Sequence, residues 1–211
     1  MEHWTEYTRF IIALFLILNP FTALPIFLSL TKTYNTIERG HIANISAISV
    51  FLVLVVATLT GETLLQTMGT SLASFRVGGG IVVLLIAIAM LNGQTSKVRT
   101  TPEEEAEAED RNSIAIVPMA IPLMAGPGSI STAIIQMQRS DTEYHAILVV
   151  LSIALVCVLL WLVLRMANLI GNALGKIGVN IINRLFGLIL AAIAIEIMAN
   201  GLKELFPVLA A

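Results

Sequence analysis

The chain has 211 residues, of which 57 % are apolar and 12 % are charged, and its mean hydropathy is +0.89. A soluble domain usually carries about a quarter charged residues, so this composition excludes an ordinary water-soluble protein and predicts one embedded in a lipid bilayer. The formal net charge of −2, with no cluster of Lys and Arg, gives no indication of nucleic-acid binding. The single cysteine, Cys157, excludes an intrachain disulfide or a cysteine-based zinc cluster.

Six segments are long and apolar enough to cross a membrane as helices, which requires about 20 residues each. The sequence therefore predicts an all-α membrane protein, with the segments between the spans, including 61–74 and 167–184, as loops. The predicted spans are Phe10–Leu30, Ala43–Leu65, Phe75–Leu91, Ile114–Ile135, Ala146–Met166 and Leu185–Leu202.

The first span contains two prolines, Pro20 and Pro25, and Asn19 precedes the first of them. A proline lacks an N–H group and clashes with the carbonyl four residues earlier, and it disfavours helical geometry in the residue before it. The predicted break lies about ten residues into the span, or about 15 Å deep, near the middle of the membrane. A half-helix that begins at Pro20 is expected to present free N–H groups and the Thr22 hydroxyl to a cavity.

Two features lie between this span and the fourth. The glycines of Gly78-Gly79-Gly80 predict close packing against another membrane helix, because residues without bulk let backbones approach. The acidic run 101–110 is expected to form a short solvent-exposed helix within a cytoplasmic linker, residues 96–113. This linker would separate two domains, residues 1–95 and 114–211.

The fourth span, like the first, contains prolines that are expected to break the helix. It contains Pro118 and Pro122, followed by Gly126-Pro127-Gly128. The glycines permit a non-helical turn and Pro127 suits the first position of a second half-helix. Three hydroxyl residues follow in its first turns: Ser129, Ser131 and Thr132.

Irregular backbone at this depth is tolerated where it lines a cavity or is covered by protein. Two ordinary proline kinks are the alternative to a binding site. Helix N-termini suit a carboxylate and free carbonyls suit an ammonium group, so we expect a small zwitterion. The candidate substrate-binding residues are Asn19, Pro20, Thr22, Pro25, Gly126, Pro127, Gly128, Ser129, Ser131 and Thr132.

The sixth span contains an acidic residue, Glu196. An ionised carboxylate is costly inside a membrane, and such residues commonly face a cavity or carry protons. Two interpretations stay open: Glu196 couples transport to an ion, or it is a structural partner of Asn200 or Lys203. Arg76 and Arg184 are expected to anchor interfaces between helices.

The two halves of the chain resemble each other at a nearly constant offset. Arg76 matches Arg184, Gly79 matches Gly187 and Met90 matches Met198, while Asn19-Pro20 matches Gly126-Pro127. Because each half has an odd number of spans, the second half must enter the membrane from the opposite side. The sequence thus predicts two inverted three-helix repeats with broken first helices, an architecture of many secondary transporters.

Lys and Arg set the predicted orientation. The first, third and fifth loops carry eight of these residues and the other side carries four. The odd-numbered loops are therefore expected in the cytoplasm, and both termini outside or in the periplasm.

At these motifs the sequence resembles the MarC family of inner-membrane proteins, also called the small neutral amino acid transporter family. The resemblance implies a bacterial plasma-membrane location and uptake or exchange of small neutral amino acids such as glycine and alanine, coupled to an ion gradient. The matching stretches are Leu18–Phe27, Phe75–Gly80, Pro118–Pro127 and Arg184–Gly187.

These features leave three possible functions to compare. A secondary transporter with alternating access, coupled to H⁺ or Na⁺ and without another cofactor, is favoured. A channel or facilitator for a small neutral solute is the alternative. An intramembrane enzyme is disfavoured, because His3, His41 and His145 lie at termini or loop edges and no metal-ligand pattern occurs.

Overall fold

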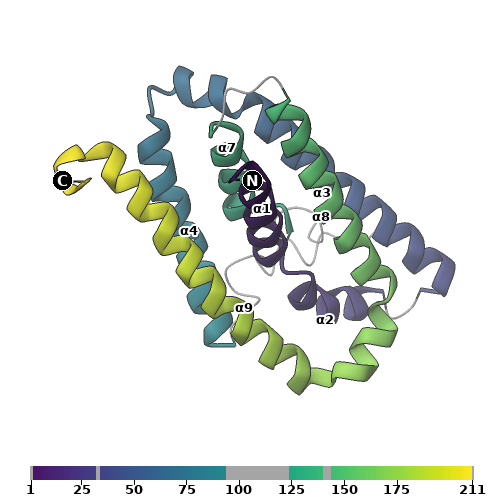
Figure 1. The fold of residues 1–211 in the computed structure, drawn as a ribbon. Helices are drawn as coiled ribbons and strands as arrows, with labels where there is room; N and C mark the ends of the chain where they lie inside the picture. The colour runs from purple at the N-terminus through teal and green to yellow at the C-terminus, as the bar shows by residue number, and fades with distance from the viewer. Residues whose placement is uncertain (1, 32–33, 94–123, 140–143, 211) are drawn as a thin grey trace.

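A computed structural model of the chain describes residues 2–31, 34–93, 124–139 and 144–210. The elements in these residues are helices, which confirms the all-α prediction (Figure 1). They are α1 (Glu2–Leu18), α2 (Pro20–Leu30), α3 (Thr36–Thr67), α4 (Leu72–Leu91), α7 (Pro127–Met137), α8 (His145–Arg165), α9 (Ala167–Leu205) and the short 3-10 helix η2 (Pro207–Ala210).

Five helical segments among the described residues are long and apolar enough to cross a membrane. They correspond to the predicted first, second, third, fifth and sixth spans. The linker 96–113 and residues 114–123 of the predicted fourth span, with Pro118 and Pro122, lie outside the described residues. The five segments are Thr5–Leu28, Thr36–Thr67, Leu72–Leu91, His145–Arg165 and Ile177–Leu205.

Two of the predicted loops are wrong in extent. Helix α3 continues to Thr67, so the loop predicted over 61–74 is reduced to a turn at 68–71. The loop predicted over 167–184 is helical and forms the first part of α9, with a kink at Gly175. That segment holds Asn and Lys residues that lower its hydropathy, but it contains no proline to end a helix. Hydropathy measures suitability for lipid and does not by itself locate helix ends.

The interrupted helices occupy the interior of the protein. In Figure 1, α4 and α9 run beside each other on one side, α3 and α8 lie on the other, and α1 and α7 lie between them. Helix α2 packs on α8 and α9. Residues of α1, α2, α3 and α8 form the main apolar core, in which Leu14, Leu18, Leu24, Val50, Leu54, Ile153 and Leu160 are fully buried.

Glycines bring the central helices into close contact, as the run at residues 78–80 predicted. A β-carbon on Gly80 would lie 3.1 Å from the carbonyl oxygen of Ala194 in α9, and one on Gly79 would lie 2.8 Å from Ser131 in α7. In the same contact between α4 and α9, a β-carbon on Gly187 of α9 would lie 3.0 Å from Cβ of Met90 in α4. Helix α4 is thus fixed between α7 and α9.

Candidate functional site

The first break in the helices is at Asn19. Helix α1 ends at Leu18 and α2 begins at Pro20. Asn19 has φ of 46°, and it is the one non-glycine residue with positive φ among the described residues. Asparagine tolerates this left-handed conformation better than most side chains do. The second proline of this span, Pro25, lies inside α2 and does not end it.

Three buried polar side chains meet at this break: Asn19, Thr22 and Asn183, which we call the polar cluster. The amide nitrogen of Asn19 donates to the hydroxyl of Thr22 and, at 3.5 Å, to the sulfur of Met90. The Thr22 hydroxyl in turn donates to the side-chain oxygen of Asn183 at 3.0 Å. All three residues are 3 % exposed or less. The polar cluster therefore ties the break to α9, and its contact with Met90 extends to α4.

The polar cluster changes one sequence-based expectation. The side-chain oxygen of Asn19 accepts a hydrogen bond of 3.3 Å from the backbone N–H of Thr22, as an N-cap residue does. Pro20 has no N–H group. The start of α2 is thus mostly satisfied by its own residues and offers fewer free N–H groups to a ligand than the sequence predicted.

The second break precedes α7, which has Gly126 as N-cap and Pro127 as its first residue. The hydroxyl of Ser129 donates to the carbonyl of Gly126 at 2.8 Å, and those of Ser131 and Thr132 donate to the carbonyl of Gly128 at 3.1 and 2.8 Å. The three hydroxyl residues are buried. Their oxygens remain available as acceptors, since a hydroxyl can donate and accept at once.

The two breaks lie against the same helix. A β-carbon on Gly128 would lie 3.5 Å from Ile17, just before the first break, and 3.5 Å from Val83 in α4. Asn19 reaches Met90 of the same α4. The structure thus brings the two motifs, far apart in sequence, to neighbouring positions on α4.

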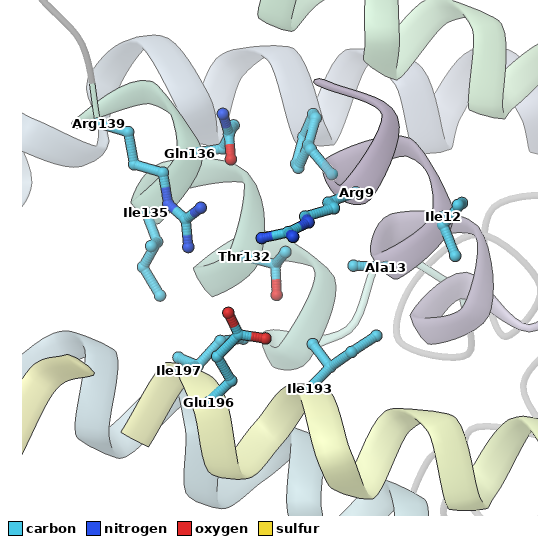
Figure 2. A pocket seen from close by; sticks show the side chains of 11 residues that line it. Arg9, Ile12, Ala13, Thr132, Ile135, Gln136, Arg139, Ile193, Glu196 and Ile197 are labelled. Atoms are coloured by element: carbon cyan, nitrogen blue, oxygen red, sulfur yellow. The ribbon is translucent and has the colours of Figure 1, made fainter. Parts of the chain in front are cut away.

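A cavity of about 370 Å³ lies between the middle of α1, the second half of α7 and the last third of α9. We call it the amino-terminal cavity. Figure 2 shows Arg9, Arg139 and Glu196 pointing into it from three different segments. Thr132 forms part of its wall and belongs to the first turns of α7. Its remaining lining residues are Phe10, Ile12, Ala13, Ile135, Gln136, Ile193 and Ile197.

Glu196 belongs to this cavity and not to the polar cluster. It is exposed at the cavity wall. Among the described residues it forms neither a hydrogen bond nor an ion pair with Asn200 or Lys203, the structural partners considered from the sequence. The ion pair in this part of the chain joins Arg76 of α4 to Glu204 of α9, so Arg76 does connect two helices.

A second cavity, of about 360 Å³, lies between α2 and the first part of α9, and we call it the α2–α9 groove. Pro25 lines it, which places this predicted site residue on the groove. The kinked Gly175 lies on the opposite wall together with Asn180. The complete lining is Leu24, Pro25, Leu28, Gly171, Gly175, Val179 and Asn180.

The sequence alone did not single out two of the buried polar residues. Asn183 was assigned to a loop because its surroundings are polar. His145 was placed at a loop edge, yet it is 2 % exposed. Its Nε2 donates to the carbonyl of Gln136 at 2.9 Å, since a carbonyl can only accept, and its Nδ1 shares a hydrogen bond of 2.6 Å with the hydroxyl of Tyr7.

Comparison with known proteins gives a consistent result. A sequence profile described as "MarC family integral membrane protein" matches residues 4–206. The chain is 38 % identical over 206 residues to the UPF0056 membrane protein YhcE of Escherichia coli, covering 95 % of this chain and 94 % of that protein. It is 38 % identical over 191 residues to the UPF0056 membrane protein MJ1677 of Methanocaldococcus jannaschii, covering 90 % and 93 %. It is 36 % identical over 199 residues to the UPF0056 membrane protein YvbG of Bacillus subtilis, covering 94 % of each. No solved structure matches the chain.

Proposed function

The chain belongs to the MarC family of multi-pass integral membrane proteins, and on this premise we propose that it is a secondary transporter of small neutral amino acids. In this proposal it moves glycine- or alanine-sized solutes across the bacterial inner membrane by alternating access. The observation that supports it most is a buried polar cluster at a broken helix with a cavity on either side of it.

The order of residues along two segments carries this argument. Along α1 and α2, the chain passes the amino-terminal cavity at 9–13, the polar cluster at 19 and 22, and the α2–α9 groove at 24–28. Along α9 the order is reversed: groove, then Asn183, then cavity. From Asn183 to Ile193 is about 15 Å at 1.5 Å per residue. Along both segments the polar cluster therefore lies between the residues that line the two cavities.

The chemistry of the cluster suits an uncharged or zwitterionic solute. Asn19, Thr22 and Asn183 offer amide and hydroxyl groups without a net charge. At the neighbouring break, the N–H groups of Gly128 and Ser129 have no hydrogen-bond partner among the described residues. A helix N-terminus carries a partial positive charge and favours a carboxylate. A solute with both an ammonium and a carboxylate group matches these donors and acceptors.

Close contacts between α4 and α9 support the proposed inverted repeat. Gly187 packs against Met90, and Gly80, one residue after the Gly79 that matches Gly187, packs against Met198, which matches Met90. A two-fold axis produces such reciprocal contacts, in which one patch meets its own counterpart. Two inverted halves give one sequence two related conformations, open to opposite sides, which is the requirement of alternating access.

The closed polar cluster favours a transporter over a channel. Its three residues are hydrogen-bonded to one another and almost completely buried, so a solute cannot pass without a change of conformation. A channel or facilitator would offer a continuous path. Counterflow distinguishes the two: unlabelled alanine inside a vesicle accelerates entry of labelled alanine through a transporter and does not through a pore.

The test is uptake of radiolabelled glycine and alanine into proteoliposomes that contain the purified protein. We expect uptake that saturates, shows counterflow, and is abolished by Asn19→Leu. Asn200→Leu is the matched control, because Asn200 lies exposed in α9 away from the cluster. Uptake should respond to an imposed H⁺ or Na⁺ gradient. A correctly folded, reconstituted protein that moves no small amino acid in either direction would disprove the proposal.

A further inference from the structure

We propose that the amino-terminal cavity is a recognition site for zwitterions, in which Arg9 and Arg139 bind the carboxylate of the solute and Glu196 binds its ammonium group. This inference deepens the proposed function and rests on it, because it names the site where the solute is first selected. It concerns a place other than the helix breaks.

The first argument is the arrangement of charge. Figure 2 shows the two guanidinium groups and the carboxylate directed into one cavity from α1, from the turn after α7, and from α9. Among the described residues the ion pair is Arg76–Glu204, and none of these three side chains takes part in one. Opposite charges that face each other without pairing leave space for a molecule that carries both signs.

The second argument is the size and nature of the walls. A volume of about 370 Å³ lies near the lower end of the range for small-molecule sites, about 300–1,000 Å³. Isoleucines on α1, α7 and α9 form most of the apolar part of the lining: Ile12, Ile135, Ile193 and Ile197. Apolar walls lower the local dielectric constant and so strengthen each charge interaction with a ligand.

The third argument is the chemistry of the three groups. A guanidinium group binds a carboxylate with two parallel hydrogen bonds, and a carboxylate accepts from an ammonium group. A simple anion would be attracted by the two arginines and repelled by Glu196. A simple cation would be attracted by Glu196 and repelled by the arginines. A zwitterion satisfies all three groups, so the cavity prefers it to acetate and to methylamine.

The cavity also connects to the break at α7. Thr132 forms part of the cavity wall, and its hydroxyl bonds to the carbonyl of Gly128 in the first turn of that helix. Gln136 lines the same wall and donates to Glu6 at 3.0 Å, which holds that amide in place. Thr132 therefore links the wall of the cavity to the broken-helix motif.

The experiment measures ligand-induced thermal stabilisation of the purified full-length protein with glycine, acetate and methylamine. Glycine should stabilise the wild-type protein more than either single-charge compound at the same concentration. Arg9→Gln and Arg139→Gln should each weaken glycine binding about tenfold or more, the loss expected for a charge-assisted hydrogen bond. Glu196→Gln should bring acetate up to the affinity of glycine. Arg184→Gln is the control, because Arg184 is exposed on α9 outside the cavity.

The outcomes separate this inference from the proposed function. The zwitterion site is overturned if Arg9→Gln, Arg139→Gln and Glu196→Gln all bind glycine as well as Arg184→Gln does, even if uptake is normal. Charge-selective binding without any uptake would support the site and disprove the transporter. If Arg9→Gln does not fold, Arg9→Lys serves instead: it keeps the charge but loses the paired hydrogen bonds, so glycine binding should weaken and the preference for zwitterions should remain.

Discussion

The hydroxyl group of Thr22 donates a 3.0 Å hydrogen bond to the side-chain oxygen of Asn183, which joins the broken first helix to the last long helix of the protein. The bond is buried and lies between the two cavities. Hydrogen-bonded polar groups in such surroundings are costly to leave unpaired. The cluster is therefore expected to be sensitive in both stability and function.

Thr22→Val removes the hydroxyl while nearly keeping the shape of the side chain. It leaves the amide of Asn19 and the oxygen of Asn183 without this partner. We expect a loss of about 1–3 kcal/mol in unfolding free energy, measured by thermal or denaturant unfolding in detergent, and a larger relative loss of glycine uptake. Thr60→Val is the control, because Thr60 is exposed and its hydroxyl bonds only to the carbonyl of Val56. Equal effects of the two substitutions would show that the polar cluster has no special role.

The backbone of Asn19 gives a second prediction, since its φ of 46° favours glycine over alanine. Both Asn19→Gly and Asn19→Ala lose the side-chain hydrogen bonds. Alanine adds about 1–2 kcal/mol of left-handed strain, so the alanine variant should be the less stable of the two. At Asn200, inside α9, the order should be the reverse, because alanine is favoured in an ordinary helix. Unfolding midpoints of the four variants test this; the same order at both positions would contradict the strained break.

Neighbouring glycines of α4 provide the third prediction. A β-carbon on Gly80 would meet the backbone of Ala194, whereas one on Gly78 would meet nothing within 4 Å. Gly80→Ala should destabilise the protein by about 1–3 kcal/mol through overpacking, and Gly78→Ala should be neutral or raise stability by up to about 1 kcal/mol. The measurement is unfolding in detergent. If Gly78→Ala is as harmful as Gly80→Ala, the close approach of α4 and α9 is wrong.

The prolines and the hydropathy pattern predicted many helix ends and spans correctly, because each of these signals depends only on residues close in the sequence. Asn19-Pro20 and Gly126-Pro127 coincide with the ends of helices, and five of the spans appear among the described residues. What the chain order does not reveal is which distant groups meet. Asn183 gained its meaning only when α9 placed it beside Thr22.

Charge was the least predictable part. From the sequence, the partners expected for Glu196 were residues on the next turns of its own helix. In the structure it faces a cavity that Arg9 and Arg139 also line. These three residues are far apart in sequence, and no periodicity connects them. The helical segment 167–184 was likewise missed, because the surroundings of its polar residues come from distant parts of the chain: Asn168 accepts from Arg39, Asn180 lines the α2–α9 groove and Asn183 belongs to the polar cluster.

The kink of α9 gives the fourth prediction. Gly175 has φ of 58° and ψ of −176°, a region populated almost only by glycine. A β-carbon there would meet nothing within 4 Å, so any cost of Gly175→Ala comes from the backbone. We expect a loss of about 1–3 kcal/mol, the usual cost of such a conformation. Gly78→Ala makes the same change in open space with ordinary geometry and serves as control. Because Gly175 lines the groove, glycine uptake should fall as well.

The orientation of the two cavities gives the last prediction. The orientation expected from the excess of Lys and Arg in the odd-numbered loops predicts that the amino-terminal cavity faces outside and the α2–α9 groove faces inside. The one native cysteine, Cys157, is buried, and Cys157→Ala provides a background without thiols. In it, Ile12→Cys reports on the cavity and Asn180→Cys on the groove, since each residue lines one of them and is exposed.

A charged, membrane-impermeant thiol reagent added to intact cells should label Ile12→Cys and leave Asn180→Cys unlabelled. Inside-out vesicles should show the opposite pattern, because the buried polar cluster blocks passage between the cavities. The Cys157→Ala parent without a new cysteine controls for background labelling. Labelling of both positions from one side would indicate an open pore and favour the channel. The reverse pattern would keep the two cavities and invert the membrane orientation. Saturating glycine should slow labelling at Ile12→Cys if the solute occupies the cavity that this residue lines.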